Sequence, residues 1–314
     1  MHNDRPLVVI AGPTGSGKSE LSLHVAGRFD GEIVNCDSIQ IYRHFDIGSA
    51  KLPVSGRRGI PHHLIDIVEP SEVFTAGDYA RVARPVLREI ADRGKLPIVV
   101  GGTGFYLRAL IEGLAPGPER DESLRERLRA REERRPGSLH RLLRRFDPAT
   151  AARIHVNDTP KLMRALEICL SARRPATEVF SAGRDALKGF RVLKLGLFPP
   201  RELLYLRLEE RMEKMFAEGL IEETAAIAKR TGFAVKPFES IGYKQAVQVV
   251  RGEISMRDAI FYARRDTRRY AKRQMTWFRQ EPGLEVVQGF GDDPAVIAKV
   301  EARVAEFLGR AAAP

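Results

Sequence analysis

The sequence has few cysteines and no long apolar segment. Only two of its 314 residues are cysteines, Cys36 and Cys169, and neither has a neighbour at the spacing of a metal-ligand or redox pair. No run of about eighteen apolar residues occurs, and the N-terminus lacks a basic stretch followed by an apolar one. We therefore expect a cytoplasmic protein with free thiols, without a disulfide framework, a secretion signal or a membrane span.

Acidic residues are scarce relative to basic ones. The chain has 52 Lys and Arg against 41 Asp and Glu, a formal net charge of +11 and a pI near 9.9. This excess indicates an anionic partner, and nucleic acid is the leading candidate. Arg-rich composition also occurs on solvated helix faces of no special function, so charge alone leaves the partner open.

A phosphate-binding pattern stands near the N-terminus. Gly12, four intervening residues, Gly17, Lys18 and Ser19 fit the P-loop motif, between an apolar strand-like run at 7–11 and a helix-like run. The glycines let backbone N–H groups converge on an anion, Lys18 adds a charge and Ser19 can hold Mg²⁺. The motif leaves open whose phosphates are bound. The residues expected to bind them are Gly12, Pro13, Thr14, Gly15, Ser16, Gly17, Lys18 and Ser19.

Two further strand-like runs end on polar residues. The run 31–36 leads to Asp37, and the run 96–101 leads through a glycine-rich turn to Thr103. Because chemistry in open α/β sheets gathers at the carboxyl ends of the strands, both side chains are site candidates beside the P-loop. The alternatives are a turn or cap residue for Asp37 and a structural strand-to-helix turn at Thr103.

His62 and His63 lie in a segment, 61–68, that we expect to form another short strand. Paired histidines can bind zinc, but no third ligand follows at helical or hairpin spacing. We therefore expect hydrogen-bonded structural histidines.

Composition changes after the Ala115 to Pro118 stretch. Residues 119–189 contain no convincing strand and have 17 Lys and Arg against 11 Asp and Glu, a net charge of +6. A strand-like run resumes at 191–197, which indicates that a core domain is interrupted rather than finished. We expect an α/β fold with a P-loop NTPase-like parallel sheet flanked by helices, and an all-α insertion. The predicted parts are a first core segment at 1–116, the insertion at 117–189 and a second core segment at 190–314.

The segment 257–279 is the second concentration of positive charge. It has 8 Lys and Arg against 2 Asp and Glu, again +6. Its cations recur at helical spacing, so one face could follow a phosphate backbone. They are Arg265, Arg268, Arg269, Lys272 and Arg273. We expect the interleaved aromatic residues to anchor the helix in its own core rather than to stack on bases.

Taken together, the motifs resemble the tRNA dimethylallyltransferase family, whose members prenylate the adenosine 3′ of the tRNA anticodon. Seven blocks carry the resemblance, in the family's order: GPTGSGKS, NCDSIQIYR followed by DIGSAK, PHHLID, GGTGFYLRAL, NDTPKLMRALE, ESIGYKQ and RRYAKRQMTWFR. The resemblance implies that the P-loop holds dimethylallyl diphosphate with Mg²⁺ and that the insertion and the basic helix bind the tRNA anticodon stem-loop. It further implies a cytoplasmic enzyme, which we expect to be a monomer.

The resemblance also implies roles for particular residues. Asp37 would be the general base, and Thr14, Lys18 and Arg211 would act on the diphosphate, with Ser19 on the metal. The residues implied in tRNA binding, together with three cations of the basic segment, are Asp37, Ser38, Ile39, Gln40, Thr103, Arg125, Pro160, Lys161, Leu162, Met163, Arg164, Glu239, Ser240, Ile241, Gly242, Tyr243, Lys244, Arg269, Lys272 and Arg273.

Three other functions use part of the same pattern. A small-molecule kinase needs only the P-loop and a carboxylate, and leaves the two basic segments unexplained. An enzyme that prenylates free adenine nucleotides shares the core but needs no RNA-binding insertion. A non-catalytic RNA-binding protein does not require Asp37 beside the P-loop.

Overall fold

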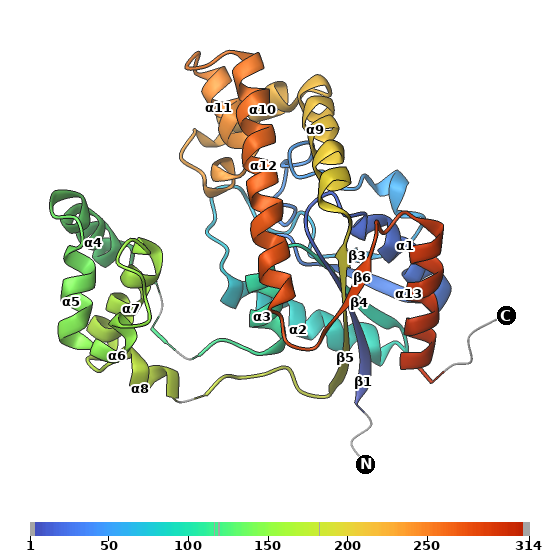
Figure 1. Ribbon diagram of the computed structural model, residues 1–314, viewed down its shortest axis with the longest axis horizontal. Coiled ribbons are helices and arrows are strands. Elements are labelled where there is room, and N and C mark those ends of the chain that lie inside the picture. Colours follow the sequence, from blue (N-terminus) through green and yellow to red (C-terminus); the bar gives the residue numbers. More distant parts are fainter. Residues whose placement is uncertain (1–3, 116, 119, 182, 310–314) are drawn as a thin grey trace. The chain divides into compact units, whose positions relative to one another are not determined.

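A computed structural model describes residues 4–115, 117–118, 120–181 and 183–309 of the chain. The chain divides into two compact units, Met1–Leu110 with Leu187–Pro314 and Ile111–Ala186, of which only the residues just given are described. The second unit interrupts the first in the sequence (Figure 1). It begins six residues before the insertion predicted at 117–189 and ends three residues before its end, and residue 116 lies outside the described residues.

The first unit is built on a parallel six-stranded sheet. The strands are β1 (Arg5–Ala11), β2 (Gly31–Asn35), β3 (His62–His63), β4 (Leu96–Gly101), β5 (Phe190–Phe198) and β6 (Leu284–Gln288), in the order β3-β2-β4-β1-β5-β6. In the centre, Val9 is in register with Val99 of β4 and Lys194 of β5. The predicted α/β fold class is confirmed. The strand predicted at 61–68 is confined to His62 and His63, and β6 was not predicted.

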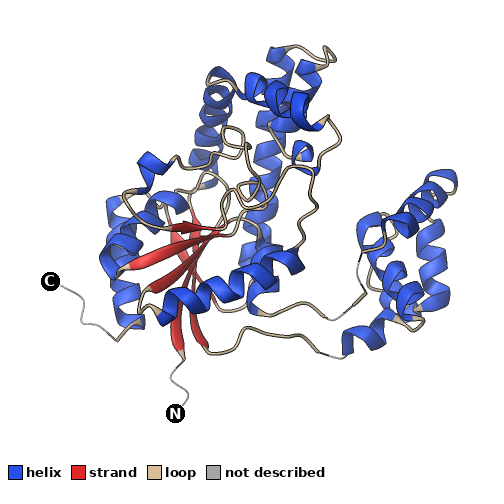
Figure 2. Ribbon diagram, turned by 180° about the vertical axis from the view of Figure 1, so that it is seen from behind, coloured by secondary structure: helices blue, strands red, loops and turns tan. Residues whose placement is uncertain are grey.

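Helices cover both faces of this sheet (Figures 1 and 2). Helices α1 (Lys18–Phe29) and α13 (Pro294–Phe307) pack on one face, where their apolar residues join those of the strands in one core. Helix α2 (Ala76–Asp92) lies on the other face, followed by α3 (Gly104–Ile111) after β4. Thr75 begins α2 because its hydroxyl accepts from the Asp78 amide while the Asp78 carboxylate accepts from the Thr75 amide.

A group of helices stands beyond the carboxyl ends of the strands (Figure 1). It contains α9 (Arg201–Ala217), α10 (Leu220–Thr231), the 3₁₀ turn η2 (Lys236–Glu239), α11 (Tyr243–Val250) and α12 (Met256–Arg279). A second apolar core holds these helices against the loop that follows β2, where Phe45 contacts Tyr243 edge to face. Another 3₁₀ turn, η1 (Val54–Arg57), lies in the chain between β2 and β3.

The described residues of the second unit form helices and no strand. The helices are α4 (Glu122–Arg134), α5 (Ser138–Phe146), α6 (Pro148–Ala151), α7 (Thr159–Ala172) and α8 (Ala176–Ser181). They bury an apolar core of their own, as an independently folding domain does. Asp147 helps to join them, because its carboxylate accepts from the backbone amides of Thr150 and Thr177 at 2.9 and 2.8 Å. In the part of the chain that the structure describes, no helix combines the length and apolarity needed to cross a bilayer.

Candidate active site

The P-loop connects β1 to the first turn of α1. Gly17 precedes α1 with φ of 84°, a left-handed conformation that glycine adopts without strain. A Cβ at this position would lie 2.7 Å from the Gly291 nitrogen, so close packing also requires glycine there. The Gly291 amide, in the segment between β6 and α13, donates to the Ser16 carbonyl at 2.8 Å and so holds the P-loop in place. The amides of the first turn of α1 have no partner within the helix and are free to bind an anion.

Lys18 is the central positive charge of the loop. Its Nζ donates to the Pro13 carbonyl at 2.6 Å, and among the described residues it has no carboxylate within ion-pair distance. Burial lowers the pKa of Lys18 to about 8, with Asp37 opposing this shift and Arg211 adding to it. A phosphate would relieve the cost of burying this ammonium.

Arg211 reaches the same place from α9. Its Nη1 lies 3.5 Å from the Thr14 hydroxyl, and its Nε is buried without a hydrogen-bond partner among the described residues. Burial lowers the pKa of this guanidinium, and Asp37 partly offsets the effect. Two half-buried cations therefore converge on the loop, an arrangement that suits an anion.

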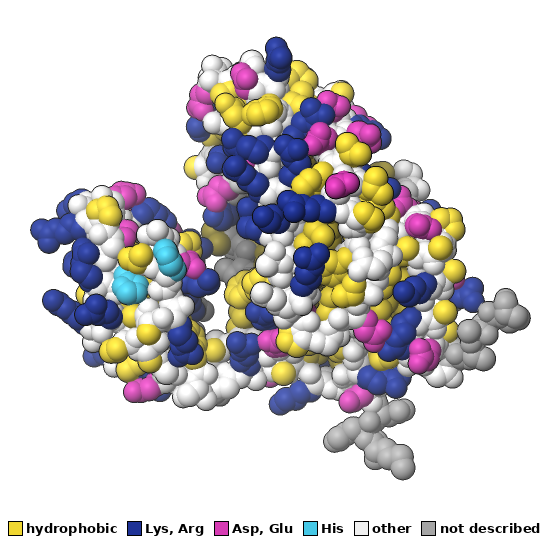
Figure 3. Space-filling view, in the orientation of Figure 1, with side chains coloured by type: hydrophobic (Ala, Val, Ile, Leu, Met, Phe, Trp, Pro, Cys, Tyr) yellow, Lys and Arg dark blue, Asp and Glu magenta, His cyan; other side chains and the backbone are white. Residues whose placement is uncertain are grey.

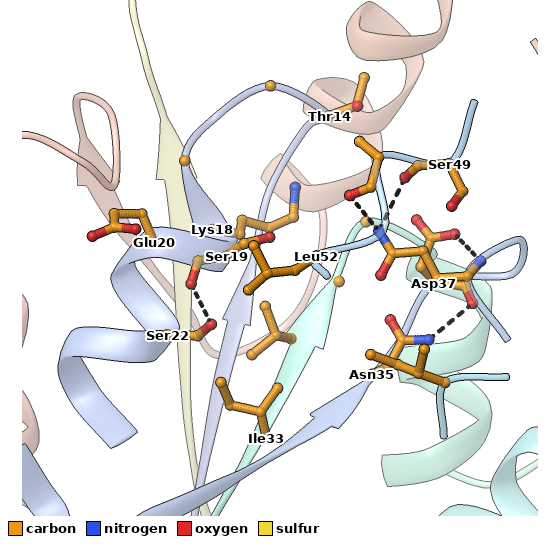
Figure 4. A pocket seen from close by; sticks show the side chains of 18 of the residues that line it. Thr14, Lys18, Ser19, Glu20, Ser22, Ile33, Asn35, Asp37, Ser49 and Leu52 are labelled. Atoms are coloured by element: carbon orange, nitrogen blue, oxygen red, sulfur yellow. Dashed lines mark hydrogen bonds between the residues drawn. The ribbon is translucent and has the colours of Figure 1, made fainter. Parts of the chain in front are cut away.

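Asp37 stands two residues after β2, across the pocket from Lys18 and Ser19 (Figure 4). Its Oδ1 accepts from the backbone amides of Ile39 and Gln40, at 2.8 and 3.2 Å. No described residue donates a hydrogen bond to Oδ2. The turn-cap role and the site role are thus compatible, because one oxygen orients the carboxylate and the other is available to a ligand.

Two cavities meet at this carboxylate. The first, of about 400 Å³, is lined on one side by Gly15, Gly17, Lys18 and Ser19 of the P-loop. The second, of about 310 Å³, opens between α9, α12 and the segment around η2. Five residues line both: Thr14, Asp37, Ser49, Arg211 and Tyr270. A phosphate-bearing molecule in the first cavity and another molecule in the second would therefore approach each other beside Asp37.

Most of the predicted residues on the core side line this pair of cavities. Gln40 lines the first cavity, and Ser38, Ile39, Glu239, Ser240, Ile241 and Arg273 line the second. The Thr103 hydroxyl accepts from the Ser38 amide at 3.2 Å and so orients the turn that carries Asp37. Gly12, Pro13, Ser16, Gly242 and Lys244 line neither cavity.

Tyr243 differs from the rest of its segment. Its side chain is fully buried, and its hydroxyl donates to Glu223 and accepts from the Gly48 amide. This side chain supports the loop at Gly48 and Ser49. The RNA contact at Tyr243 stays a prediction, and the structure places the aromatic ring of this residue in the core beside Phe45.

Helix α12 carries cations of two kinds. Arg264 and Arg268 pair with glutamates of α9, and Arg265 pairs with Asp266. Arg269, Lys272 and Arg273 are exposed and form no ion pair with any described residue. We call these three residues the basic face. In Figure 3, Lys and Arg side chains gather over this helix. Arg265 and Arg268 are thus engaged within the fold, and the expectation that cations of this helix follow a phosphate backbone now applies to the basic face alone.

The second unit holds the remaining predicted residues. Pro160 and Lys161 are exposed at the start of α7, but Leu162 and Met163 are buried in the core of the unit. Arg125 makes a two-point contact with the fully buried Glu167, at 2.9 and 3.0 Å, and Arg164 donates to the same carboxylate. The RNA contacts at Leu162 and Met163 stay predictions, and the structure shows that α7 uses these two side chains for packing.

The paired histidines are hydrogen-bonded, as expected. The Nε2 of His63 is 2.7 Å from Glu32, and the Nδ1 of His62 is 2.8 Å from the Ile60 carbonyl. His62 also lines the first cavity.

Sequence reasoning missed Gln274. This buried residue of α12 lines the first cavity and donates to one backbone segment while accepting from another. The signal available in the sequence was a polar residue one turn after Tyr270, on the side of the helix opposite the exposed cations.

Comparisons with known proteins agree with this geometry. The profile of the IPP transferase family matches residues 40–281. A tRNA dimethylallyltransferase of Solibacter usitatus is 62% identical over 97% of this chain and 100% of that protein. A crystal structure of the full-length tRNA isopentenylpyrophosphate transferase from Bacillus halodurans is 36% identical, covers 97% of both chains and has a TM-score of 0.72. A eukaryotic dimethylallyltransferase captured acting on tRNA is 28% identical, with 99% of this chain and 81% of that chain covered and a TM-score of 0.83.

Proposed function

The chain belongs to the IPP transferase family, and from this premise we propose that it transfers a dimethylallyl group from dimethylallyl diphosphate to tRNA. The acceptor is the exocyclic N6 amine of the adenosine on the 3′ side of the anticodon. The products are N6-(dimethylallyl)adenosine and diphosphate. The observation that carries the proposal is the meeting of two cavities at Asp37, one beside the P-loop and one beside α12.

The first cavity suits the diphosphate of the donor. When the bond between the allylic carbon and the diphosphate oxygen breaks, negative charge develops on the leaving group. Lys18 and Arg211 lie where they stabilise that charge, and their burial strengthens the interaction. Each of these half-buried cations is partly removed from water and has no carboxylate partner among the described residues, so their placement favours a polyphosphate ligand.

Asp37 is placed to accept the proton of the acceptor amine. The lone pair of an adenine amine is delocalised into the ring, so the nucleophile is weak until its proton is taken up. As the carbon–nitrogen bond forms, the proton passes to the Asp37 carboxylate, whose orientation is fixed through Oδ1. Once donor and acceptor fill the two cavities, they would displace water from the allylic carbon, where it would hydrolyse the donor.

Ser19 fits a magnesium ion that is shared with phosphates. Its hydroxyl is a hard oxygen donor at the wall of the first cavity. Among the described residues there is no group of three or more His, Cys, Asp or Glu side chains that could hold a metal. A Mg²⁺ bound through Ser19, the diphosphate and waters suits this donor set, and it would add charge stabilisation to the leaving group.

The second cavity and the basic face suit the RNA. A stacked adenosine must leave its stack to enter an enclosed cavity, at a cost of about a few kcal/mol. Phosphate contacts by Arg269, Lys272 and Arg273, and by exposed cations of the helical insertion such as Lys161, would offset this cost. We propose that the enzyme acts as a monomer in the cytoplasm, where it meets tRNA.

The test is to incubate the protein with labelled dimethylallyl diphosphate and Mg²⁺ in the presence of unmodified tRNA, AMP or ATP. Label should enter tRNA alone, in the nucleotide 3′ of the anticodon. Label in AMP or ATP and not in tRNA would replace the proposal with prenylation of free nucleotides. Transfer of a γ-phosphate from ATP without prenylation would indicate a kinase.

A further inference from the structure

Gln274 joins three segments of the core that lie far apart in the sequence. Its side chain is 7% exposed and extends from α12. The Oε1 accepts from the Thr14 amide of the P-loop at 2.9 Å, and the Nε2 donates to the Gly102 carbonyl, after β4, also at 2.9 Å. The two partners fix the orientation of the amide group, because a backbone N–H can only donate and a carbonyl can only accept.

The backbone around Gln274 leaves room for it. A Cβ at position 102 would lie 2.4 Å from the Gln274 Nε2, so glycine at this position admits the side chain. Both backbone groups lose a partner if the amide is removed. An unpaired buried N–H or carbonyl is costly, and this cost would fall on the loop that binds the diphosphate.

The contact to Thr14 has a direct consequence for the site. Because the Thr14 amide is already used by Gln274, the anion must be held by amides further along the loop. The Thr14 hydroxyl then stands between the cavities, 3.5 Å from Arg211. The position of this hydroxyl therefore depends on the position of Gln274.

Helix α12 also supplies residues on the acceptor side. Tyr270 lines both cavities one turn before Gln274, and Arg273 lines the second. We propose that Gln274 is a positioning residue that ties the P-loop to α12, so that a single helix sets both the leaving-group site and the acceptor side. This proposal rests on the function proposed above, and it assigns Gln274 no contact with a reacting atom.

The first experiment is calorimetric binding of inorganic diphosphate with Mg²⁺ to the Gln274→Leu variant. Leucine has nearly the same size but makes neither hydrogen bond. We expect diphosphate to bind about ten- to a hundredfold more weakly, and the KM for dimethylallyl diphosphate to rise with it. The Kd for tRNA should stay within about twofold, because the basic face is unchanged. Gln288→Leu, an exposed position on β6, is the matched control and should change none of these values.

The second experiment uses the Gln274→Glu variant at different pH values. When the carboxyl group introduced by this substitution is protonated, it can accept from the Thr14 amide and donate to the Gly102 carbonyl, whereas the ionised form cannot donate. Diphosphate affinity relative to the unaltered protein should therefore recover between about pH 8 and pH 5.5 in Gln274→Glu and not in Gln274→Leu. Thermal unfolding of each variant checks that it is folded.

Unchanged diphosphate affinity in a folded Gln274→Leu variant would overturn the proposal, as would equal losses of diphosphate and tRNA affinity. Should Gln274→Leu fail to fold, the pH profile of Gln274→Glu decides, and a flat profile would overturn the proposal. Binding of inorganic diphosphate does not depend on prenyl transfer. A protein that binds diphosphate through Gln274 but leaves tRNA unmodified would contradict the proposed function alone.

Discussion

Both the core and the helical insertion neutralise buried carboxylates within the fold, as Lys194 does for Glu281 in the core, but two half-buried cations beside the core cavities have no carboxylate partner among the described residues. In the insertion, the fully buried Glu167 is neutralised by Arg125 and Arg164 and accepts from the Asp121 amide as well. In the core, Lys18 and Arg211 lie beside the cavities and form no ion pair with any described residue. A charge that serves the fold is paired within it, whereas half-buried cations without a carboxylate partner indicate a ligand of opposite charge.

The pKa values follow the same division. Hydrogen bonds from Arg125 and Arg164 outweigh burial and lower the pKa of Glu167 to about 2, so the ionised form is strongly favoured. Burial lowers the pKa of Lys18 to about 8, so its charged form is less favoured than that of a solvent-exposed lysine and is stabilised by an anion beside it. The paired Glu167 stabilises the folded insertion, whereas the unpaired Lys18 favours the binding of an anion.

The largest effect is expected from Asp37→Asn, which tests whether the carboxylate at the cavities is functional. Asparagine keeps an oxygen that can accept from the Ile39 and Gln40 amides but cannot take up the amine proton. Turnover should fall about 10²- to 10⁴-fold, with tRNA binding and thermal unfolding nearly unchanged. Single-turnover prenylation measures the loss. Near-normal turnover would remove the general-base assignment.

Glu167→Ala tests the other half of the comparison. Two arginines would be left close together without their carboxylate, and we expect the insertion to lose about 3 kcal/mol of stability. Hydrogen exchange should show faster exchange in α4 and α7 while the central strands stay protected. Because the folded pKa lies below the usual 4.5, the contribution of Glu167 is complete above about pH 4.5 and is lost as the pH falls toward 2. Equal protection in both proteins would mean that the cluster does not hold the insertion together.

The pH dependence of diphosphate binding tests the ligand preference of Lys18. The ammonium loses its proton above about pH 8 in the free protein, so affinity should fall about tenfold per pH unit above that value. Calorimetry between pH 7 and pH 9.5 measures this slope. Lys18→Met is the control, because its remaining pH dependence reports the titration of diphosphate itself. Parallel profiles in the two proteins would show that Lys18 keeps its proton throughout.

The parts of the site that the sequence predicted are those encoded locally. The P-loop needs glycines and a lysine at fixed spacing, and Asp37 follows directly from the end of a strand. Gln274 could not be predicted in this way, because its partner Thr14 is 260 positions away and only the folded chain brings them together. The strand β6 escaped prediction because it is a short edge strand with three of its five residues exposed.

The sequence predicted how much positive charge each segment carries, but not which charged side chains form ion pairs within the fold. The sequence indicated two basic segments of +6 each, yet it could not tell which arginines are paired within the fold. Arg268 meets Glu209 only because α9 and α12 lie side by side (Figure 1). Glu167 likewise stands out only once α7 and α4 pack, because a single acidic residue in a helix is ordinarily expected at the surface.

The smallest effect is expected from Arg269→Ala, which extends the comparison of paired and unpaired charges to an exposed cation. Arg269 is exposed and unpaired among the described residues, so its removal should cost no stability. The substitution should weaken tRNA binding several-fold. It should also lower the slope of log Kd against log salt concentration by about one, the change expected when one phosphate contact is lost. Lys299→Ala removes the same charge from an exposed position on α13 and is the matched control. An equal loss of affinity in both variants would mean that tRNA responds to the net charge of the protein, and a loss confined to Arg269→Ala would locate a phosphate contact on the basic face.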